Sequence, residues 1–290
     1  MTYFLQDKDL KGTSAVLRIW GPDANSYLQG QFTQDLRLKT GETAYGLWLD
    51  LKGKTFADSQ VLKQAENDYL VVSFSTSAAA LRARLEAYLI ADEVELEDQT
   101  TAWVSILLWG EGIAALVAPQ SVLAWPSRRA GSVSRQWLVP AGQSEAVLAE
   151  LKKSATESDH FAADLARLRT ALPAVPVDIG PRDLPNEGGL DEIAISYTKG
   201  CYLGQEVMAR LKNLGQVRRR LHVIRGEGTP PPPGTALYQG ERKVGETRSA
   251  APDGSEFIAL AMLSLVNLDA AAGLGLAPHS SPAIKIGPHV

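Results

Sequence analysis

Residues 199–206, K-G-C-Y-L-G-Q-E, hold the only cysteine of the chain. A thiol becomes nucleophilic when a nearby cation or a helix N-terminus stabilises its thiolate. Lys199 stands two residues before Cys201, so an extended stretch would project both side chains to the same side. A helix is also expected to begin near Gly204. These neighbours could make Cys201 and Lys199 catalytic, but the residues alone favour a small buried hydrophobe at Cys201, because free cysteine is among the most buried residue types.

A metal centre built by this chain alone is not expected. Zinc and iron-sulfur sites need several closely spaced cysteine or histidine ligands. The four histidines, His160, His222, His279 and His289, are scattered and lie far from Cys201 in the sequence. A cluster shared between two chains stays open.

Two carboxylates stand where they could bind a ligand. Asp58 interrupts the strand pattern of K-T-F-A-D-S-Q-V-L, and Glu187 lies beside two glycines, where the backbone can approach a ligand closely. A carboxylate near a pocket can accept paired N–H donors from a heterocycle, although turn chemistry explains either residue as well. The chain has no glycine-rich phosphate loop of the G-x-G-x-x-G or G-x-x-x-x-G-K-S/T type and no G-x-S-x-G elbow, which disfavours nucleotide enzymes and serine hydrolases.

A run of arginines, Arg218 to Arg220 with Arg225, could contact phosphate, because guanidinium groups supply paired donors. On an alternating strand, however, Arg218 and Arg220 share one face and Arg219 takes the other. A solvated strand face with ion pairs to Glu227 is therefore the competing interpretation.

Composition sets the frame for these residues. A chain of 290 residues with 45% apolar residues and a net charge of −4 predicts a globular protein of two domains, or three small ones. There is no global basic excess for nucleic acid, so binding to it is not expected. One cysteine and charged opening residues indicate a reducing cytoplasm without a secretory signal. The apolar run at 258–277 is interrupted by Asn267 and Asp269, so no membrane span is expected.

Strands and helices alternate in an α+β manner along the first 170 residues. The expected strands lie at 16–20, 43–50, 54–62, 69–75, 93–98, 103–109 and 134–140. The expected helices begin at Pro22, at Thr76 or Ser77, near 112, at Ser144 and at Asp159. The repeated order suggests two similar α+β halves, although no sequence repeat is visible.

The remaining residues divide into a loop and a terminal domain. Four prolines between 173 and 185 forbid regular structure, and the apolar residues among them favour an ordered loop that lines a site. A helix follows at 205–211. Beyond Asn213 to Gly215 the pattern becomes β-rich, which predicts residues 214–290 as a small barrel of roughly six strands and residues 1–213 as two intertwined α+β domains.

Taken together, the octapeptide and the V-M-A-R that follows it closely resemble the signature of the YgfZ-type folate-binding proteins. These are relatives of the glycine cleavage T-protein and serve iron-sulfur protein maintenance. Three further blocks occur in the family's order: W-G-P-D-A-N-S-Y-L-Q-G-Q-F-T-Q-D-L, G-L-W-L-D-L-K-G-K-T-F-A-D and L-P-N-E-G-G-L. The resemblance covers most of residues 16–225. The octapeptide is specific, whereas the other blocks are shared more widely within the superfamily.

The resemblance implies a cloverleaf of three domains, two α+β and one β-barrel, around a central pocket for tetrahydrofolate. It places Glu187 where the T-protein holds the pterin, and a pterin edge offers a carboxylate two parallel donors. It also implies folate contacts from Asp58, Tyr202, Gln205 and Arg210.

One departure from the T-protein pattern bears on activity. The T-protein uses an aspartate from an acidic pair for aminomethyl transfer, and here the pair reads Ala57-Asp58. The resemblance therefore implies a folate-dependent accessory factor for iron-sulfur client proteins, including those that modify tRNA, in which Cys201 does thiol chemistry or relays a one-carbon unit or cluster fragment. The rivals are an aminomethyltransferase assisted by Asp58 and a module that docks tRNA or a protein through the strand from Arg218 to Arg225.

Overall fold

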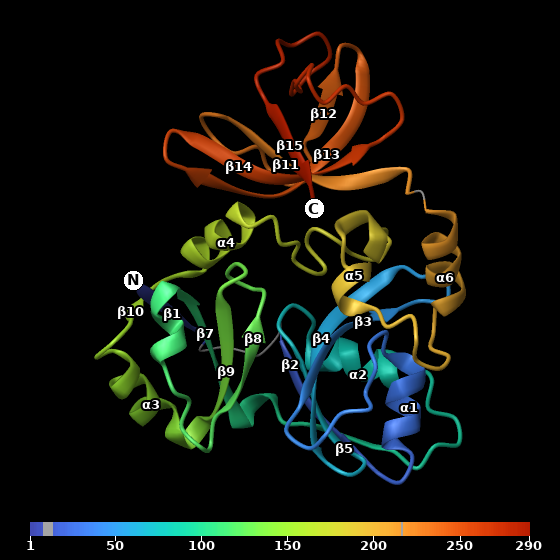
Figure 1. Cartoon of the computed structure of the whole chain (residues 1–290), viewed down its shortest axis with the longest axis vertical. Coiled ribbons are helices and arrows are strands. Elements are labelled where there is room, and N and C mark those ends of the chain that lie inside the picture. The colour runs from blue at the N-terminus through green and yellow to red at the C-terminus, as the bar shows by residue number, and fades with distance from the viewer. Residues whose placement is uncertain (8–13, 216) are drawn as a thin grey trace.

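The computed structural model describes residues 1–7, 14–215 and 217–290, and its strands form three five-stranded sheets. Figure 1 shows two of these sheets side by side and the third above them, with α4 and α5 between. The mixed α+β class predicted from the sequence is confirmed. The charged residues Lys8, Asp9 and Lys11, which argued against a secretory signal, lie outside the described residues.

The first sheet has the order β3-β4-β5-β2-β6, with every neighbouring pair antiparallel. Its strands are β2 (Ala15–Trp20), β3 (Thr43–Leu49), β4 (Thr55–Ala65), β5 (Asp68–Ser73) and β6 (Glu95–Asp98). Because side chains alternate along a strand, Leu17 and Val71 face α1 (Ala24–Gln31) and α2 (Ala78–Glu86), while Val16 and Val72 face the other way. The predicted cap of α2 is confirmed, since the Ser77 hydroxyl accepts a hydrogen bond from the Ala80 N–H.

The second sheet has the order β10-β1-β7-β9-β8. Its strands are β1 (Thr2–Asp7), β7 (Trp103–Gly110), β8 (Leu123–Ser127), β9 (Ser134–Pro140) and β10 (Thr156–Glu157). Helix α3 (Ser144–Leu151) packs on one face through Val147, Leu148 and Leu151. Strands β1, β8 and β10 were not predicted, and the helix expected near 112–118 is a 3₁₀ turn at Glu111–Ala115. Two further 3₁₀ turns lie at Thr100–Ala102 and Ala141–Gln143.

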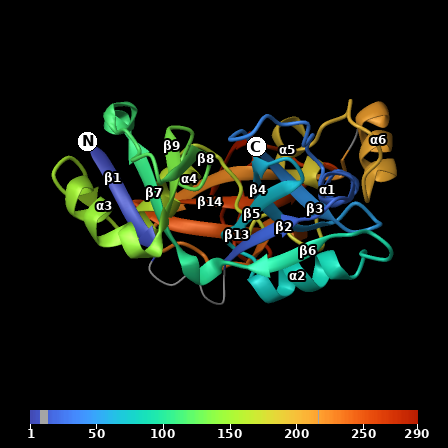
Figure 2. The same ribbon diagram turned by 90° about the horizontal axis from the view of Figure 1, so that it is seen from below.

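The first two sheets lie side by side (Figure 2). One apolar cluster joins them. Val16, Leu70 and Val72 of the first sheet meet Trp125 and Leu138 of the second within this cluster. Since all five side chains are almost fully buried, this contact holds the two sheets in place relative to each other.

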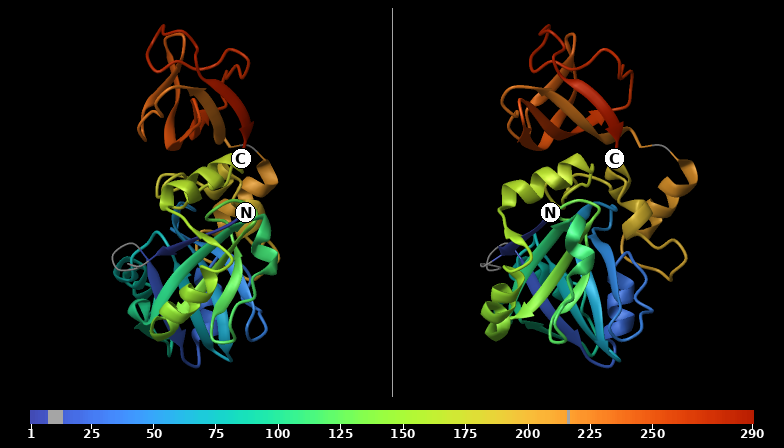
Figure 3. Two further views of the ribbon diagram at one scale, coloured as in Figure 1. Left: turned by 90° about the vertical axis from the view of Figure 1, so that its left-hand side faces the viewer. Right: turned by 60° about the vertical axis from the view of Figure 1, so that its left-hand side comes forward.

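The third sheet has the order β12-β13-β14-β11-β15 and stands at one end of the molecule (Figure 3). Its strands are β11 (Arg219–Glu227), β12 (Ala236–Gln239), β13 (Arg242–Asp253), β14 (Glu256–Ser264) and β15 (Lys285–His289). The expectation of roughly six strands was wrong by one among the described residues, because the segment around Leu274 makes only isolated bridges to Tyr238 and Ile284. The division of the chain at residues 213 and 214 stays a prediction.

A connecting segment joins the three sheets. It contains α4 (His160–Arg169), a 3₁₀ turn at Pro185–Gly188, α5 (Asp191–Ala194) and α6 (Gln205–Leu214). One apolar cluster contains Leu47 of β3, Ile179 and Leu190 of the connecting segment, and Leu221 and Ile258 of the third sheet. The proline-rich loop is therefore ordered by a shared core rather than by regular structure. No helix in the described part of the chain is long and apolar enough to cross a membrane.

Candidate functional site

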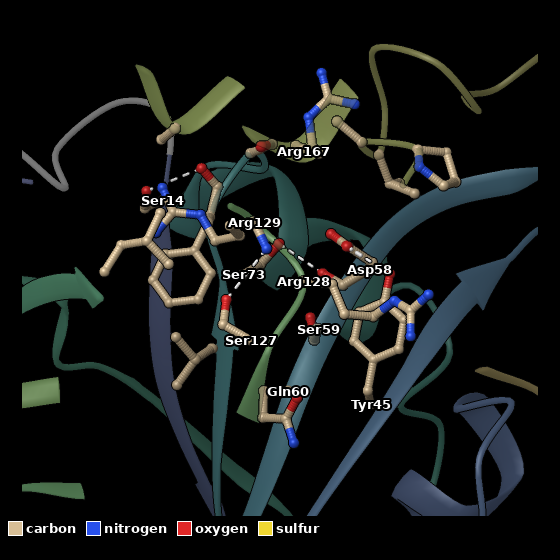
Figure 4. Close-up of a pocket in the computed structure, with 18 of the residues that line it drawn as sticks. Ser14, Tyr45, Asp58, Ser59, Gln60, Ser73, Ser127, Arg128, Arg129 and Arg167 are labelled. Carbon is tan, nitrogen blue, oxygen red and sulfur yellow. Dashed lines mark hydrogen bonds between the residues drawn. The ribbon is translucent and has the colours of Figure 1, made fainter. Parts of the chain in front are cut away.

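A cavity of about 840 Å³ opens where the first two sheets, α4 and the proline-rich loop meet. Its polar lining comes from β3, β4 and β5 of the first sheet, from the residues that end β8, and from α4 (Figure 4). Ser249 of β13 adds a contribution from the third sheet. All three sheets therefore take part in forming one pocket.

Strand register places Asp58 in this cavity. Tyr45 pairs with Gln60 across β3 and β4, so Asp58, two residues earlier, lies diagonally opposite Tyr45 on the same face. The Tyr45 hydroxyl donates to Asp58 Oδ2 at 2.9 Å, and the Ser73 hydroxyl donates to the Asp58 carbonyl at 2.7 Å. The predicted interruption of the strand pattern at Asp58 thus turns a carboxylate toward the cavity.

Burial raises the pKa of Asp58 to about 6, although the hydrogen bond from Tyr45 acts in the opposite direction. The pKa of Tyr45 is raised well above its usual value, first by burial and then by the charge of Asp58. The pair can therefore accept or release one proton at Asp58 near neutral pH, while Tyr45 stays a hydrogen-bond donor.

Three arginines line the same cavity, and they differ in what they contact. Arg129 stacks over the Phe74 ring at 4.2 Å and donates to Gln136 Oε1 at 3.1 Å. Arg167 is almost fully buried in ion pairs. Arg128 follows β8 directly, and Figure 4 shows it on the same side of the cavity as Asp58 and Tyr45.

Arg167 and Asp178 form a buried junction beside the cavity. Their Nη1 and Oδ2 atoms lie 2.7 Å apart, and the side chains are 4% and 0% exposed. Asp178 also accepts hydrogen bonds from the Ala174 N–H and from the backbone N–H and hydroxyl of Ser249. One carboxylate thereby joins α4, the proline-rich loop and β13.

Glu187 lies in a second junction and not among the residues that line the cavity. Its carboxylate pairs with Arg219 of β11, with Oε1 at 2.7 Å from Nε and Oε2 at 3.0 Å from Nη2. Oε2 also accepts the Leu184 N–H at 2.8 Å. Asp183, 1% exposed, binds Arg219 and Arg248 in the same cluster. The role of Glu187 in holding a pterin stays a prediction.

Cys201 is exposed, so the interpretation of this thiol as a buried hydrophobe was wrong. Lys199 is only 6% exposed, and its ammonium group donates to the carbonyls of Phe32 and Gln34 at 2.7 and 2.9 Å. Burial lowers the pKa of Lys199 to about 8. The thiol is therefore exposed, whereas the ammonium group is buried and bound to backbone carbonyls; the pairing of Lys199 with Cys201 in thiol chemistry stays a prediction.

The backbone requires a glycine at position 204, the sixth residue of the octapeptide. Gly204 has a φ of +83°, and a Cβ there would come within 2.8 Å of the Asp50 carbonyl. This close approach seats the start of α6 on the turn between β3 and β4. The helix predicted to begin near Gly204 is confirmed.

The other residues predicted to contact folate lie around this turn. Tyr202 is buried, and its hydroxyl has no hydrogen-bond partner in the described part of the chain; its backbone N–H donates to Gln205 Oε1 at 3.3 Å. Arg210 is exposed on α6. None of the three lines the cavity, so their contacts with folate also stay predictions.

The arginine strand is engaged in ion pairs, but not with the partner expected. Arg219 pairs with Asp183 and Glu187, and Arg225 pairs with Asp253 rather than Glu227. The strand therefore offers less free positive charge for nucleic acid than its sequence suggests. In the described ranges no group of histidine, cysteine and carboxylate residues could hold a metal ion.

Comparison with known proteins places the chain in a family. It is 32% identical over 245 residues to the tRNA-modifying protein YgfZ of Vibrio vulnificus, and the match covers 81% of this chain and 75% of that protein. The chain belongs to the YgfZ family.

Further comparisons relate this YgfZ-family chain to more distant proteins. The GCVT N-terminal domain family matches residues 12–122, and the CAF17 C-terminal beta-barrel domain family matches residues 218–281. The mitochondrial iron-sulfur cluster assembly factor IBA57 homolog of Cryptococcus neoformans is 24% identical over 247 residues, covering 73% of this chain and 64% of that protein.

A solved structure confirms the predicted T-protein fold. The glycine cleavage system aminomethyltransferase T from Bartonella henselae superimposes with a TM-score of 0.81 at 17% identity, covering 99% of this chain and 85% of that one. At this identity the likeness concerns the fold. The predicted cloverleaf therefore describes this YgfZ-family chain.

Most polar residues of the cavity were not singled out from the YgfZ-family sequence, and Tyr45 and Arg128 show why. Tyr45 lies in the predicted strand T-A-Y-G-L-W-L-D, and the pairing of this strand with the one that carries Asp58 would have placed both on one face. Arg128 gave no signal, because the strand that precedes it, L-A-W-P-S, contains a proline and was not predicted.

Proposed function

We propose that this chain binds a reduced folate in the central cavity and supports the assembly or repair of iron-sulfur proteins, including proteins that act in tRNA modification. The observation that carries the folate part is the Asp58–Tyr45 pair in a cavity formed by all three sheets of an aminomethyltransferase fold. The wider role is supported by two relatives, which are a tRNA-modifying protein and an iron-sulfur cluster assembly factor.

The cavity suits a ligand of this class. Its volume of about 840 Å³ lies within the range of about 300–1,000 Å³ that is usual for small-molecule sites. The Asp58 carboxylate can accept the N–H donors of a pterin, and Val72 and Trp125 supply apolar walls for its ring. Tetrahydrofolate, when bound, supplies a carrier for a one-carbon unit.

In this function, Cys201 contacts a client protein. Its exposure lets another chain reach the sulfur, and no metal-binding group lies among the described residues. An iron-sulfur cluster fragment held by Cys201 would therefore take its other ligands from the partner.

Calorimetric titration with tetrahydrofolate tests the folate part. We expect saturable binding by the unsubstituted chain, and an affinity about tenfold lower for Asp58→Asn, because a hydrogen bond to a charged acceptor is lost. Asp164→Asn is the matched control, since Asp164 lines the cavity but pairs with Arg167. Mass spectrometry of any ligand that copurifies provides a second measurement. Absence of saturable binding would refute the proposal.

An aminomethyltransferase is the second candidate, and the pKa of Asp58 favours it. A carboxyl group with a pKa of about 6 can move a proton near neutral pH, as transfer from an aminomethylated carrier requires. Release of ammonia and methylenetetrahydrofolate from an aminomethylated lipoyl carrier, abolished in Asp58→Asn, would establish this activity. Folate binding without that release would leave the accessory role.

A further inference from the structure

One charged side chain that lines the cavity has no partner of opposite charge among the described residues. Asp58 and Asp164 are the carboxylates among the described lining residues, and Arg128, Arg129 and Arg167 are the arginines. Asp164 Oδ1 lies 3.1 Å from Arg167 Nε. Asp58 accepts a hydrogen bond from Tyr45 and, with a pKa of about 6, is largely ionised at neutral pH; among the cavity arginines its charge is attracted to Arg129.

Arg128 is the arginine without a counter-ion. Among the described residues no hydrogen bond or ion pair engages its guanidinium, in contrast to Arg129 and Arg167. The residue keeps solvent contact through the open cavity, but burial of the guanidinium lowers its pKa. A cation in this position lowers its free energy by pairing with an anion that enters the cavity.

We propose that Arg128 recognises a carboxylate of the cavity's ligand, namely a carboxylate of the glutamyl tail of folate. This inference rests on the proposed function and deepens it. Asp58 accepts the N–H donors of the neutral heterocycle, and Arg128 pairs with the anionic end. The planar guanidinium can form two parallel hydrogen bonds to one carboxylate, which fixes orientation as well as charge.

This division of roles predicts selectivity for the tail. A ligand that keeps the pterin and the aminobenzoyl ring but lacks glutamate would leave Arg128 unpaired. The contribution of Arg128 should therefore be visible only with the glutamylated ligand, which separates recognition from a general effect on folding or on cavity shape.

The experiment compares tetrahydrofolate with tetrahydropteroate, which lacks the glutamate, by calorimetric titration. For Arg128→Gln we expect the affinity for tetrahydrofolate to fall about 10–100-fold, while the affinity for tetrahydropteroate changes little. Arg128→Lys should restore part of the loss, because it returns the charge without the paired donors. Arg135→Gln, on β9 outside the cavity lining, is the control.

The outcomes separate this inference from the function on which it rests. Equal tetrahydrofolate affinities for the unsubstituted chain and Arg128→Gln would overturn the role of Arg128 and leave folate binding standing. An equal loss for both ligands would also overturn it, since the effect would not concern the carboxylate. No tetrahydrofolate binding by the unsubstituted chain would overturn the proposed function and this inference together.

Discussion

The central cavity and the junctions beside it use the same residue types in opposite ways. At the junctions Asp178, Asp183 and Glu187 are buried and saturated by arginines, hydroxyls and backbone N–H groups. In the cavity Asp58 has one side-chain hydrogen bond from a tyrosine, and Arg128 has no partner among the described residues.

This difference separates groups that hold the fold from groups that are available to a ligand. A buried carboxylate whose hydrogen bonds are all made has little capacity left for a ligand, whereas a half-satisfied one near a cavity has. The sequence block in which a carboxylate lies does not tell a structural carboxylate from a ligand-binding one, because Glu187 and Asp58 both lie in blocks that resemble the T-protein. The contacts do distinguish them.

The largest loss of stability should follow from removing the Asp178 carboxylate. Asp178→Ala leaves Arg167 buried without its main partner and removes the acceptor for Ser249 and Ala174. We expect the free energy of unfolding in urea to fall by about 3–5 kcal/mol. Asp164→Asn, on the exposed side of the same arginine, should cost less than about 1 kcal/mol. Similar losses for both variants would contradict the assignment of Asp178 as a structural junction.

Glu187→Gln should cause the second-largest loss of stability. It removes one charge from the pair with Arg219 while Asp183 continues to bind that arginine, so we expect a loss of about 2–3 kcal/mol in unfolding free energy. Folate affinity, measured in parallel at a temperature where the variant is folded, should change less than in Asp58→Asn. A larger loss of affinity than in Asp58→Asn would instead support the direct pterin contact that the family resemblance implies.

The sequence was informative where signals are local. Strand alternation, the caps at Ser77 and Asp159 and the glycine at 204 each depend on residues within a few positions, and the elements they predicted are present. Strand β1 was missed because Thr2–Asp7 acquires its role only by pairing with β7, about a hundred residues later. The same reason hid the hydrogen bonding of Glu187, because its partner Arg219 lies 32 residues later, in β11 of the third sheet.

Asp58→Asn should change the free energy of unfolding by a smaller amount and in the opposite direction. The folded pKa of Asp58, about 6, lies above the unfolded value, so its favourable contribution is fully present below about pH 4 and is lost as pH rises through about 6. Asp58→Asn keeps an acceptor for Tyr45 without the charge. We expect the variant to be more stable than the unsubstituted chain by about 1–2 kcal/mol at pH 7.5, after allowance for the open cavity.

Urea denaturation at several pH values gives the control for this prediction. The difference between Asp58→Asn and the unsubstituted chain should shrink as pH falls through about 6 and vanish near pH 4, where both side chains are neutral. A difference that stays constant with pH would show that packing rather than ionisation accounts for it.

Cys201 should give the smallest change in stability, because it belongs to neither kind of region. It is exposed, so Cys201→Ser should alter the unfolding free energy by less than about 0.5 kcal/mol. In the absence of denaturant, one thiol per chain should react fully with an alkylating reagent.

Lys199→Met distinguishes two roles for the lysine, a structural one and one in the thiol chemistry of Cys201. Its ammonium group is bound to the carbonyls of Phe32 and Gln34, so we expect this variant to lose stability while Cys201 alkylates at nearly the same rate. A marked fall in the alkylation rate would instead restore the predicted pairing of Lys199 with Cys201 in thiol chemistry.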